Sequence, residues 1–506
     1  MCGYLVTPLS LNFLKGSRFI AAMKDSSIRT SDKDGINGYQ KKVYDTLYAP
    51  MSAMERLSNR GPDKTNIEQI NFNGVKFNTI HTLLSMTGET TPQPLTSDCG
   101  EYQLVFNGEI YNYKELSNNH KTDGYSIIDS YKEHGDEFTR HLRGEWSFIL
   151  FDHREKKLII STDPFGTKPL IVGENRQGLM SFSSHKSMLA AAGYSTEGNE
   201  IFQINANTTV IFDFKKGDKK IKDSFTFDLK QHKGSYDDWS KAFLQSISRR
   251  FNNTGANNIL LPMSAGADSG GISCAFNELN INNVFTYSII GDEDPNILYA
   301  RLAINAEKRP NQHGSMSRPI LTSHEIDFMR SRMFKNEKFE AFHYGSGPGT
   351  LAGYNDVGIM GLGCLIRHTK SVYPNVRIVA SGIGGDEIMT TLQTYTTAGS
   401  NPNPKKFPDD LSSVFPWDNF FGGTLSGYLS GVESIAGGFG LEGRYPYLDV
   451  DLVQEFLWLN ADLKNKEYKA PLLNFLDEHN YPRSHGDPDT YKRGFNPTIH
   501  LNMKNI

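Results

Sequence analysis

The sequence predicts two parts of different fold: an α+β part rich in strands, followed by an α/β part with a parallel sheet. In the first half, short β-rich stretches are separated by turns; they lie at 72–86, 101–107, 145–151, 157–162, 180–183 and 208–214. In the second half, apolar strands at 259–263, 284–289 and 376–380 alternate with helical stretches. Strands that alternate with helices form parallel sheets covered on both faces.

A polar, lysine-rich segment at 215–235 separates these parts. Such a segment is typical of a solvated linker. We therefore expect a first domain at 2–212, a linker at 213–235 and a second domain at 236–506.

Composition excludes several classes of function. The 506 residues carry a net charge of -4, which argues against a dedicated nucleic-acid or membrane surface. No apolar run reaches the ~20 residues that span a bilayer, and the first residues do not resemble a signal peptide. The four cysteines suit neither a disulfide framework nor a zinc site. We expect a cytoplasmic protein with small-molecule substrates and leave open whether it forms a homodimer.

Cys2 is a candidate nucleophile. Removal of Met1 is favoured because the next side chain is small, and it would leave a thiol and a free α-amine on one residue. An α-amine has an ordinary pKa of about 7.7–8.0 and can take the thiol proton directly or through water. A nucleophile and a base on one residue is a known form of covalent catalysis. A cysteine at position 2 is usually incidental, so this role needs support from other residues.

Three further features supply groups that a glutamine-hydrolysing site needs. Arg60 lies in an Arg-Gly-Pro-Asp turn, where its guanidinium suits an α-carboxylate. Asn107 and Gly108 follow a predicted strand, and an amide side chain and a glycine N–H can donate to an oxyanion. Glu109 and Asp123 supply carboxylates for an α-ammonium group.

Residues 2–190 resemble the class II glutamine amidotransferase domain, an N-terminal-nucleophile (Ntn) hydrolase. Six segments match in order: Cys-Gly at 2–3, Leu-Ser-Asn-Arg-Gly-Pro-Asp at 57–63, Gln-Pro-Leu at 93–95, Asn-Gly-Glu-Ile-Tyr-Asn at 107–112, Thr-Asp at 122–123, and Asp-Pro-Phe-Gly-Thr-Lys-Pro-Leu at 163–170. The resemblance implies a four-layer αββα sandwich with Cys2 as nucleophile and an oxyanion hole at Asn107 and Gly108. The glutamine-binding residues that it implies are Arg60, Asn107, Gly108, Glu109 and Asp123.

The sequence departs from this family at 81–85. It has His-Thr-Leu-Leu-Ser where relatives usually carry His-Arg-Arg-Leu-Ser. The missing arginines are not the catalytic groups of the family, so we expect their loss to affect local packing or coupling.

Two glycine-rich turns in the second half are candidate nucleotide-binding loops. The first, Met-Ser-Ala-Gly-Ala-Asp-Ser at 263–269, joins a predicted strand to a predicted helix. Its N–H groups and the helix N-terminus favour an anion, although its spacing is not that of a Walker loop. The second, Ser-Gly-Ile-Gly-Gly-Asp-Glu at 381–387, follows the strand at 376–380.

The first turn resembles the pyrophosphate loop of N-type ATP pyrophosphatases, and the second resembles a segment of the asparagine synthetases. Residues 440–449 and 492–495 also match family segments, so the resemblance to asparagine synthetases covers nearly the whole chain. It implies a fold like the adenine nucleotide alpha hydrolases, ATP and Mg²⁺ as cofactors, Asp268 and Asp386 as metal ligands and Lys492 as a catalytic cation. The ATP-binding residues that it implies are Met263, Ser264, Gly266, Asp268, Ser269, Ser288, Ser381 and Gly382.

This resemblance implies a ligase that adenylates a carboxylate, releases pyrophosphate and then amidates the carboxylate with ammonia from glutamine. Several departures leave the acceptor open. Ile383 replaces the family glutamate, Ala265 a glycine and Gly270 a serine, and Leu473 stands where a basic residue often occurs. One hypothesis is a divergent asparagine synthetase that converts aspartate and handles the proton through Glu387 or water. A second is an amidotransferase for a different carboxylate. A glutaminase with a nucleotide-sensing second half and an acyl-adenylating ligase that joins an amine or closes a ring are further alternatives.

Overall fold

The computed structural model contains two compact units, which divide between Thr226 and Phe227. Within the ranges that the structure describes, no helix is long and apolar enough to cross a membrane. The residues described are 2–8, 53–117, 121–174, 180–195, 200–252, 254–255, 257–289, 294–310, 315–318, 322, 324–325, 328–329, 331, 343–344, 351–352, 357–390 and 406–485.

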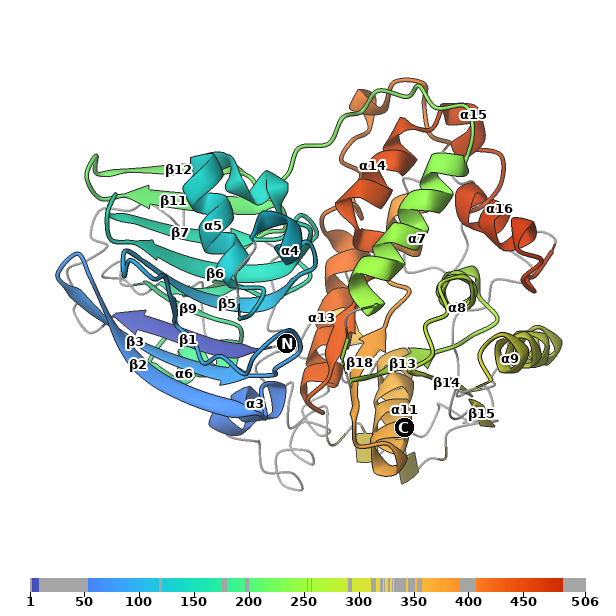
Figure 1. Cartoon of the computed structure of the whole chain (residues 1–506), viewed down its shortest axis with the longest axis horizontal. Coiled ribbons are helices and arrows are strands. Elements are labelled where there is room, and N and C mark those ends of the chain that lie inside the picture. Colours follow the sequence, from blue (N-terminus) through green and yellow to red (C-terminus); the bar gives the residue numbers. More distant parts are fainter. Residues whose placement is uncertain are drawn as a thin grey trace. The chain divides into compact units, whose positions relative to one another are not determined.

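Two six-stranded antiparallel sheets form the first unit, one above the other in Figure 1. The first sheet has the order β10 (Ile201–Gln203), β8 (Ile171–Glu174), β9 (Met180–Ser183), β1 (Gly3–Pro8), β3 (Val75–Leu83), β2 (Lys64–Phe72). The second has the order β12 (Asp218–Asp223), β11 (Thr208–Asp213), β7 (Lys157–Thr162), β6 (Gly144–Asp152), β5 (Tyr102–Ile110), β4 (Leu95–Thr96).

Alternation of side chains along the strands gives this unit four layers. Tyr4 of β1 and Val105 of β5 belong to a large apolar core shared by the inner faces of the two sheets. Residues of opposite parity, such as Leu5 and Phe106, face outward, because successive side chains of a strand point to opposite faces. They pack against α3 (Ala53–Arg60) and α6 (Lys186–Ala191) on one sheet, and against α5 (Tyr125–His134) and the short helix η1 (Gly135–His141) on the other. The expected αββα sandwich is confirmed.

The segment that we expected to be a linker is in part a strand. β12 (Asp218–Asp223) pairs with β11 along its whole length, through a turn in which Gly217 has a φ of 71°. Lys220 is exposed on this edge strand, whereas Lys222 is mostly buried and lies 2.6 Å from Glu137 Oε1. Charged side chains on an edge strand discourage pairing with another chain. A lysine-rich edge strand and a linker share the same composition, so charge alone could not separate them.

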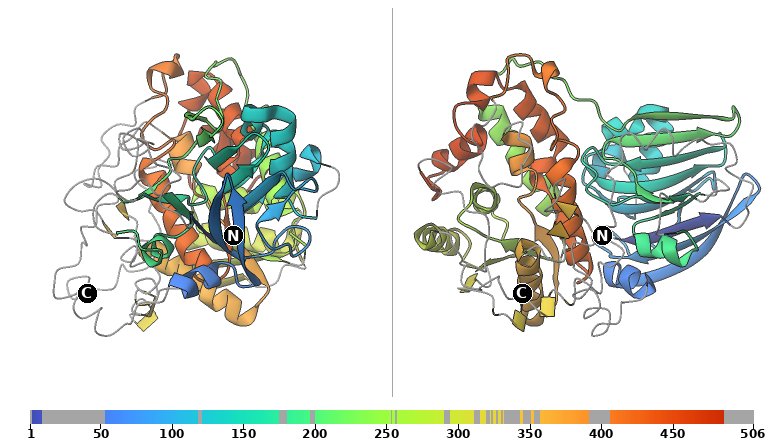
Figure 2. Two further views of the ribbon diagram at one scale, coloured as in Figure 1. Left: turned by 90° about the vertical axis from the view of Figure 1, so that its left-hand side faces the viewer. Right: turned by 180° about the vertical axis from the view of Figure 1, so that it is seen from behind.

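A five-stranded parallel sheet forms the centre of the second unit, as the sequence predicts. Its order is β15 (Ser315–Arg318), β14 (Val284–Ile289), β13 (Asn258–Pro262), β18 (Val376–Ala380), β19 (Glu442–Arg444). Helices lie on both faces of the sheet (Figures 1 and 2). The longer ones are α7 (Asp237–Phe251), α8 (Ala267–Glu278), α9 (Pro295–Lys308), α11 (Val357–Val372), α13 (Gly423–Gly437), α14 (Val450–Trp458) and α16 (Ala470–Glu478).

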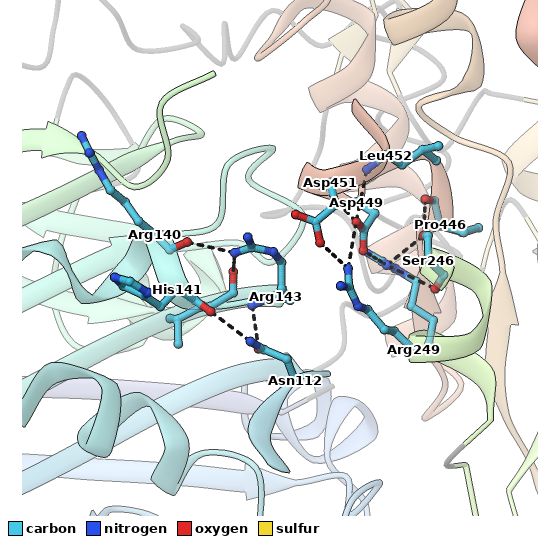
Figure 3. A network of polar contacts seen from close by, with 12 residues as sticks. Asn112, Arg140, His141, Arg143, Ser246, Arg249, Pro446, Asp449, Asp451 and Leu452 are labelled. Carbon is cyan, nitrogen blue, oxygen red and sulfur yellow. Dashed lines mark hydrogen bonds and ion pairs between the residues drawn. The ribbon is translucent and has the colours of Figure 1, made fainter. Parts of the chain in front are cut away.

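An ionic network joins α7 to α14 (Figure 3). Arg249 Nη1 lies 3.3 Å from Asp449 Oδ1 and 2.6 Å from Asp451 Oδ2, and Arg250 Nη1 lies 2.7 Å from Asp449 Oδ2. Asp449 also accepts hydrogen bonds from the backbone nitrogens of Asp451 and Leu452, so it caps α14. The network fixes the helices that flank the parallel sheet.

Candidate active site

Cys2 stands at the start of β1, next to Asn107 of β5. Its backbone nitrogen donates a hydrogen bond of 2.7 Å to Asn107 Oδ1. Its side chain is buried, with Sγ 4.0 Å from the carbonyl oxygen of Leu84. This nitrogen would become the α-amine if Met1 were removed, so a base and a thiol would both lie beside the predicted oxyanion donor.

The side-chain amide of Asn107 has a donor that remains available. Because Oδ1 accepts from Cys2, Nδ2 points in another direction, and none of the described residues accepts a hydrogen bond from it. Asn107 is fully buried. A buried donor without an acceptor is costly, and such donors are often completed by a ligand or water.

Gly108 is required by its surroundings. Its φ is 144°, and a Cβ at this position would lie 1.9 Å from the carbonyl oxygen of Glu145 on the neighbouring strand β6. No residue with a side chain fits here without a shift of the backbone. Gly108 and Cys2 line the same pocket.

Two buried carboxylates line this pocket, Glu109 and Asp123. Thr87 Oγ1 donates to Glu109 Oε2 at 2.6 Å, and the backbone nitrogen of Ile110 donates to Asp123 Oδ2 at 2.8 Å. Hydrogen bonds from donors stabilise the charged form of a carboxylate. The pair can therefore hold a cationic group inside the pocket.

The loop that follows β5 is fixed by the side chain of Asn112 (Figure 3). Asn112 Nδ2 donates to the carbonyl oxygen of His141 at 3.0 Å, and Asn112 Oδ1 accepts from the backbone nitrogen of Arg143 at 2.8 Å. These contacts hold the end of the 107–112 segment, so Gly108 and Glu109 keep their positions.

Arg60 lies outside the wall of this pocket. It ends α3, is buried, and its Nη1 lies 3.5 Å from His185 Nε2. The structure thus brings together Cys2, Gly108, Glu109 and Asp123 around one pocket, with Asn107 directly behind Cys2, but does not bring Arg60 to its surface.

A buried ion pair supports the strand that carries these residues. Lys168 Nζ lies 3.3 Å from Glu145 Oε2, and both side chains are almost fully buried. Glu145 is the register partner of Glu109 on β5. Sequence analysis recognised the 163–170 segment but assigned Lys168 no role, because its partner on β6 carries no motif of its own.

The candidate nucleotide site lies where the strand order of the parallel sheet changes direction. β13 and β18 are neighbours in the sheet. The strand that follows β13 in sequence, β14, lies on the side of β13 away from β18, and the strand that follows β18, β19, lies on the side of β18 away from β13. Ligands of open α/β sheets bind at such a point, beyond the carboxyl ends of the strands. The 263–269 and 381–387 turns follow these two strands. A Cβ on Gly385 would lie 2.1 Å from Asp268 Oδ1, so glycine allows the turns to approach closely.

The side chain of Arg301, on α9, binds the backbone of the first turn. Its Nη1 donates to the carbonyl oxygens of Ser264 and Gly266 at 2.5 and 2.9 Å. Ser264 and Ser269 share a hydrogen bond of 2.9 Å between their hydroxyls. The Ser264 and Gly266 nitrogens donate to the hydroxyls of Ser269 and Ser264. An anion at this turn would therefore meet these hydroxyls and the remaining N–H groups.

The guanidinium of Arg301 also accounts for Gly270, which departs from the family serine. A Cβ at this position would lie 2.5–2.8 Å from the guanidinium atoms. Sequence analysis missed Arg301, because a single arginine in an amphipathic helix gives no signal of what it contacts.

Asp268 and Asp386 converge on Lys469, a residue that sequence analysis also missed. Lys469 Nζ lies 2.6 Å from both carboxylate oxygens of Asp268 and 3.1 Å from Asp386 Oδ1. Burial alone would lower the pKa of Lys469, but the two carboxylates raise it overall. Tyr468 also donates its hydroxyl to Asp386.

The two carboxylates fit Mg²⁺. Hard oxygen ligands suit this ion, which is usually bound by one or two carboxylates together with substrate phosphates and water. The side chains of Asp268 and Asp386 are 24% and 26% exposed, so an ion could reach them. In the part of the chain that the structure describes, no group of three or more His, Cys, Asp or Glu could hold a metal by itself. Phosphate oxygens would have to complete the ligand set.

The remaining predicted ATP-binding residues lie near these turns. Met263 follows β13, Ser288 lies in β14, and Ser381 and Gly382 follow β18. Ser288 Oγ is buried and has no hydrogen-bond partner among the described residues. Lys492 lies outside the described residues.

Glu387 is a buried acid in the second turn. Burial, followed by the nearby charge of Asp386, raises its pKa to about 7. Its Oε2 accepts a hydrogen bond of 3.0 Å from the backbone nitrogen of Gly384. This carboxyl can therefore hold or release a proton near neutral pH, next to Ile383.

Residues 34–216 match the family described as glutamine amidotransferase domain. The amino-terminal unit thus resembles a glutamine amidotransferase domain. It is similar to an asparagine synthetase (glutamine-hydrolysing) of Brassica oleracea, with 34% identity over 136 residues, 26% of this chain and 23% of that protein. A probable asparagine synthetase of Dictyostelium discoideum is 31% identical over 145 residues, which cover 26% of this chain and 25% of that protein. The matched stretches thus span about a quarter of each relative.

Two solved structures cover similar shares of the chain. The structure described as the allosteric regulatory enzyme of purine biosynthesis covers 52% of this chain and 76% of its own, with 12% identity and a TM-score of 0.28. Glutamine phosphoribosylpyrophosphate amidotransferase from Bacillus subtilis covers 53% of this chain and 79% of its own, with 11% identity and a TM-score of 0.27.

Proposed function

We propose that this chain is a glutamine-dependent, ATP-consuming amidotransferase, with glutamine, ATP and a carboxylate as its substrates. The observation that carries the proposal is the hydrogen bond between the Cys2 nitrogen and Asn107 Oδ1. It lies beside a pocket with Gly108 and two buried carboxylates. The amidotransferase domain and the similarity to asparagine synthetases support the same function.

The first reaction releases ammonia. The Cys2 sulfur attacks the γ-amide carbon of glutamine while its proton passes to the α-amine. Asn107 Nδ2 and the Gly108 N–H donate to the resulting oxyanion. The carbon–nitrogen bond then breaks, the proton returns to the leaving nitrogen, and ammonia departs. Water hydrolyses the thioester, which gives glutamate and restores the thiol.

The second reaction uses ATP. An oxygen of the carboxylate substrate attacks the α-phosphorus, pyrophosphate leaves, and ammonia then displaces AMP from the acyl-adenylate. The N–H groups of the 263–269 turn would bind phosphate oxygens, and the Lys469 ammonium would neutralise charge near them. Asp268 and Asp386 would hold Mg²⁺, which neutralises charge on the phosphates when it is bound.

The acceptor is a carboxylate, and we propose aspartate first because the relatives are named asparagine synthetases. Glu387 is the acid next to Ile383 that could take a proton from the attacking ammonia, since its pKa is about 7. A less polar carboxylate beside Ile383 is the second candidate.

Cys2→Ala tests the proposal. We expect it to abolish glutamine-dependent amide and pyrophosphate formation while synthesis from added ammonium continues, because only the ammonia source is removed. Cys99→Ala is the matched control, since Cys99 is exposed.

Aspartate is supplied with ATP and Mg²⁺, and asparagine, pyrophosphate and glutamate are measured together. Asparagine formed in step with pyrophosphate supports aspartate as acceptor; pyrophosphate that only another carboxylate elicits assigns a different one. Glutamine-dependent synthesis that survives Cys2→Ala would refute the nucleophile, and glutamate release with no ATP use by the wild type would refute the ligase.

A further inference from the structure

The pocket beside Cys2 is acidic. Three carboxylates line it, from Glu89, Glu109 and Asp123. Glu109 and Asp123 are buried, whereas Glu89 is exposed. Among the described residues that line the pocket, none is lysine, arginine or histidine. A negative pocket raises the local concentration of cations and disfavours anions.

Leu83 forms part of the same wall. It is the last residue of β3, where its backbone oxygen accepts a hydrogen bond of 2.9 Å from the Asp63 nitrogen. Leu84 and Met86 line the pocket beside it. The corresponding segment of the related family carries arginine at this position, so an apolar side chain replaces a cation in this wall.

These surroundings suit one end of glutamine better than the other. The α-ammonium group would pair with Glu109 and Asp123. The α-carboxylate would meet carboxylates, apolar side chains and neutral polar groups such as Ser85, Thr91 and Gln93, but no cation among the described lining residues. A buried charge without a counter-ion is costly. Arg60, the predicted partner of this group, lies outside the wall and beside His185.

We infer that this site prefers, over free glutamine, amide donors that carry an α-ammonium group and an uncharged group in place of the α-carboxylate. An α-amide, an ester or a peptide bond at that carbon would each meet this requirement, as in a glutaminyl residue at the start of a peptide. The inference rests on the proposed glutaminase chemistry of Cys2 and names the substrate class of the same pocket.

The first test compares two donors in the wild-type protein. L-glutamine and L-glutamine α-amide are supplied separately, and the γ-hydrolysed products are measured by mass spectrometry. We expect kcat/KM to be at least about tenfold higher for the α-amide, and this preference to shrink as salt screens the carboxylates. N-acetyl-L-glutamine α-amide, which lacks the ammonium group, should be a poor donor. Equal or better use of free glutamine would overturn the inference.

The second test reintroduces a cation. Leu83→Arg should lower the ratio of α-amide to glutamine kcat/KM by about tenfold, because a guanidinium binds a carboxylate strongly. Leu83→Gln is the matched control, since it adds polarity without charge and should leave the ratio nearly unchanged. Glu89→Lys serves if Leu83→Arg fails to fold, because Glu89 is exposed and tolerates substitution. A ratio that does not respond to a folded cationic variant would contradict the inference.

Cys2→Ala separates this inference from the proposed function. If Cys2→Ala is inactive on both donors and the wild type prefers free glutamine, only the substrate class is wrong. If Cys2→Ala hydrolyses both donors like the wild type, or if the wild type hydrolyses neither donor, the glutaminase proposal and the inferred substrate class are both wrong.

Discussion

Buried ionisable side chains distinguish the second turn of the nucleotide site. Glu387 is almost fully buried, and burial and the charge of Asp386 raise its pKa from 4.5 to about 7. The folded state therefore holds this proton over a pH range in which the unfolded chain releases it. Stability falls as pH rises from 4.5 to 7, by an amount on the order of 3 kcal/mol for a shift of this size.

Glu387→Gln should remove this dependence. The variant lacks a buried charge at high pH, so its unfolding temperature relative to the wild type should rise between pH 5 and pH 8. Thermal unfolding of both proteins across this range measures the difference. Glu478→Gln, at an exposed site on α16, should show no such trend. A constant difference between the Glu387 variant and the wild type would contradict the raised pKa.

At single residues, sequence analysis located groups with a motif and missed groups defined by contacts. Cys2, Asn107, Gly108, Glu109 and Asp123 lie close together at one pocket as the motifs suggested. Lys469 gave no signal, because its two partners lie 201 and 83 positions earlier in the chain. Long-range ion pairs of this kind need the fold before they can be recognised.

At the level of elements, periodicity was sufficient for the buried strands and failed at the polar edges. The apolar strands β13, β14 and β18 were predicted at nearly their observed bounds. β2 (Lys64–Phe72) was not predicted, because it lies at the edge of its sheet and most of its side chains are exposed. The lysine-rich β12 was taken for a linker for the same reason.

Gly270 of α8 lies against the guanidinium of Arg301 on α9, so a side chain at this position would displace Arg301. Gly270→Ser would push against Arg301 and disturb its hydrogen bonds to the carbonyls of the 263–269 turn. We expect the KM for ATP in ammonium-dependent synthesis to rise about tenfold, the effect of losing roughly one hydrogen bond to a charged group. Glutamine hydrolysis in the first unit should be unchanged.

Steady-state kinetics with ammonium as the nitrogen source measures this effect. Gly234→Ser is the control, because a Cβ at Gly234 would meet nothing within 4 Å. An unchanged KM for ATP in the Gly270 variant would show that Arg301 does not position the turn.

At the level of the whole molecule, both folds could be predicted from the sequence, each from a different signal. The αββα sandwich came from resemblance of short segments, and the parallel sheet came from alternation of strands and helices. The boundary was less certain from sequence, since the two units divide after Thr226, within the segment predicted to be a linker. The acceptor could not be predicted, because Ile383 breaks the one motif that would have identified it.

The amidotransferase proposal depends on a free amine on Cys2. The most direct test is the mass of the amino-terminal peptide from protein that hydrolyses glutamine. We predict a peptide that begins at Cys2, whose α-amine and thiol are both modified by reagents specific for an amino-terminal cysteine. An active preparation in which Met1 is still attached to Cys2 would contradict the account.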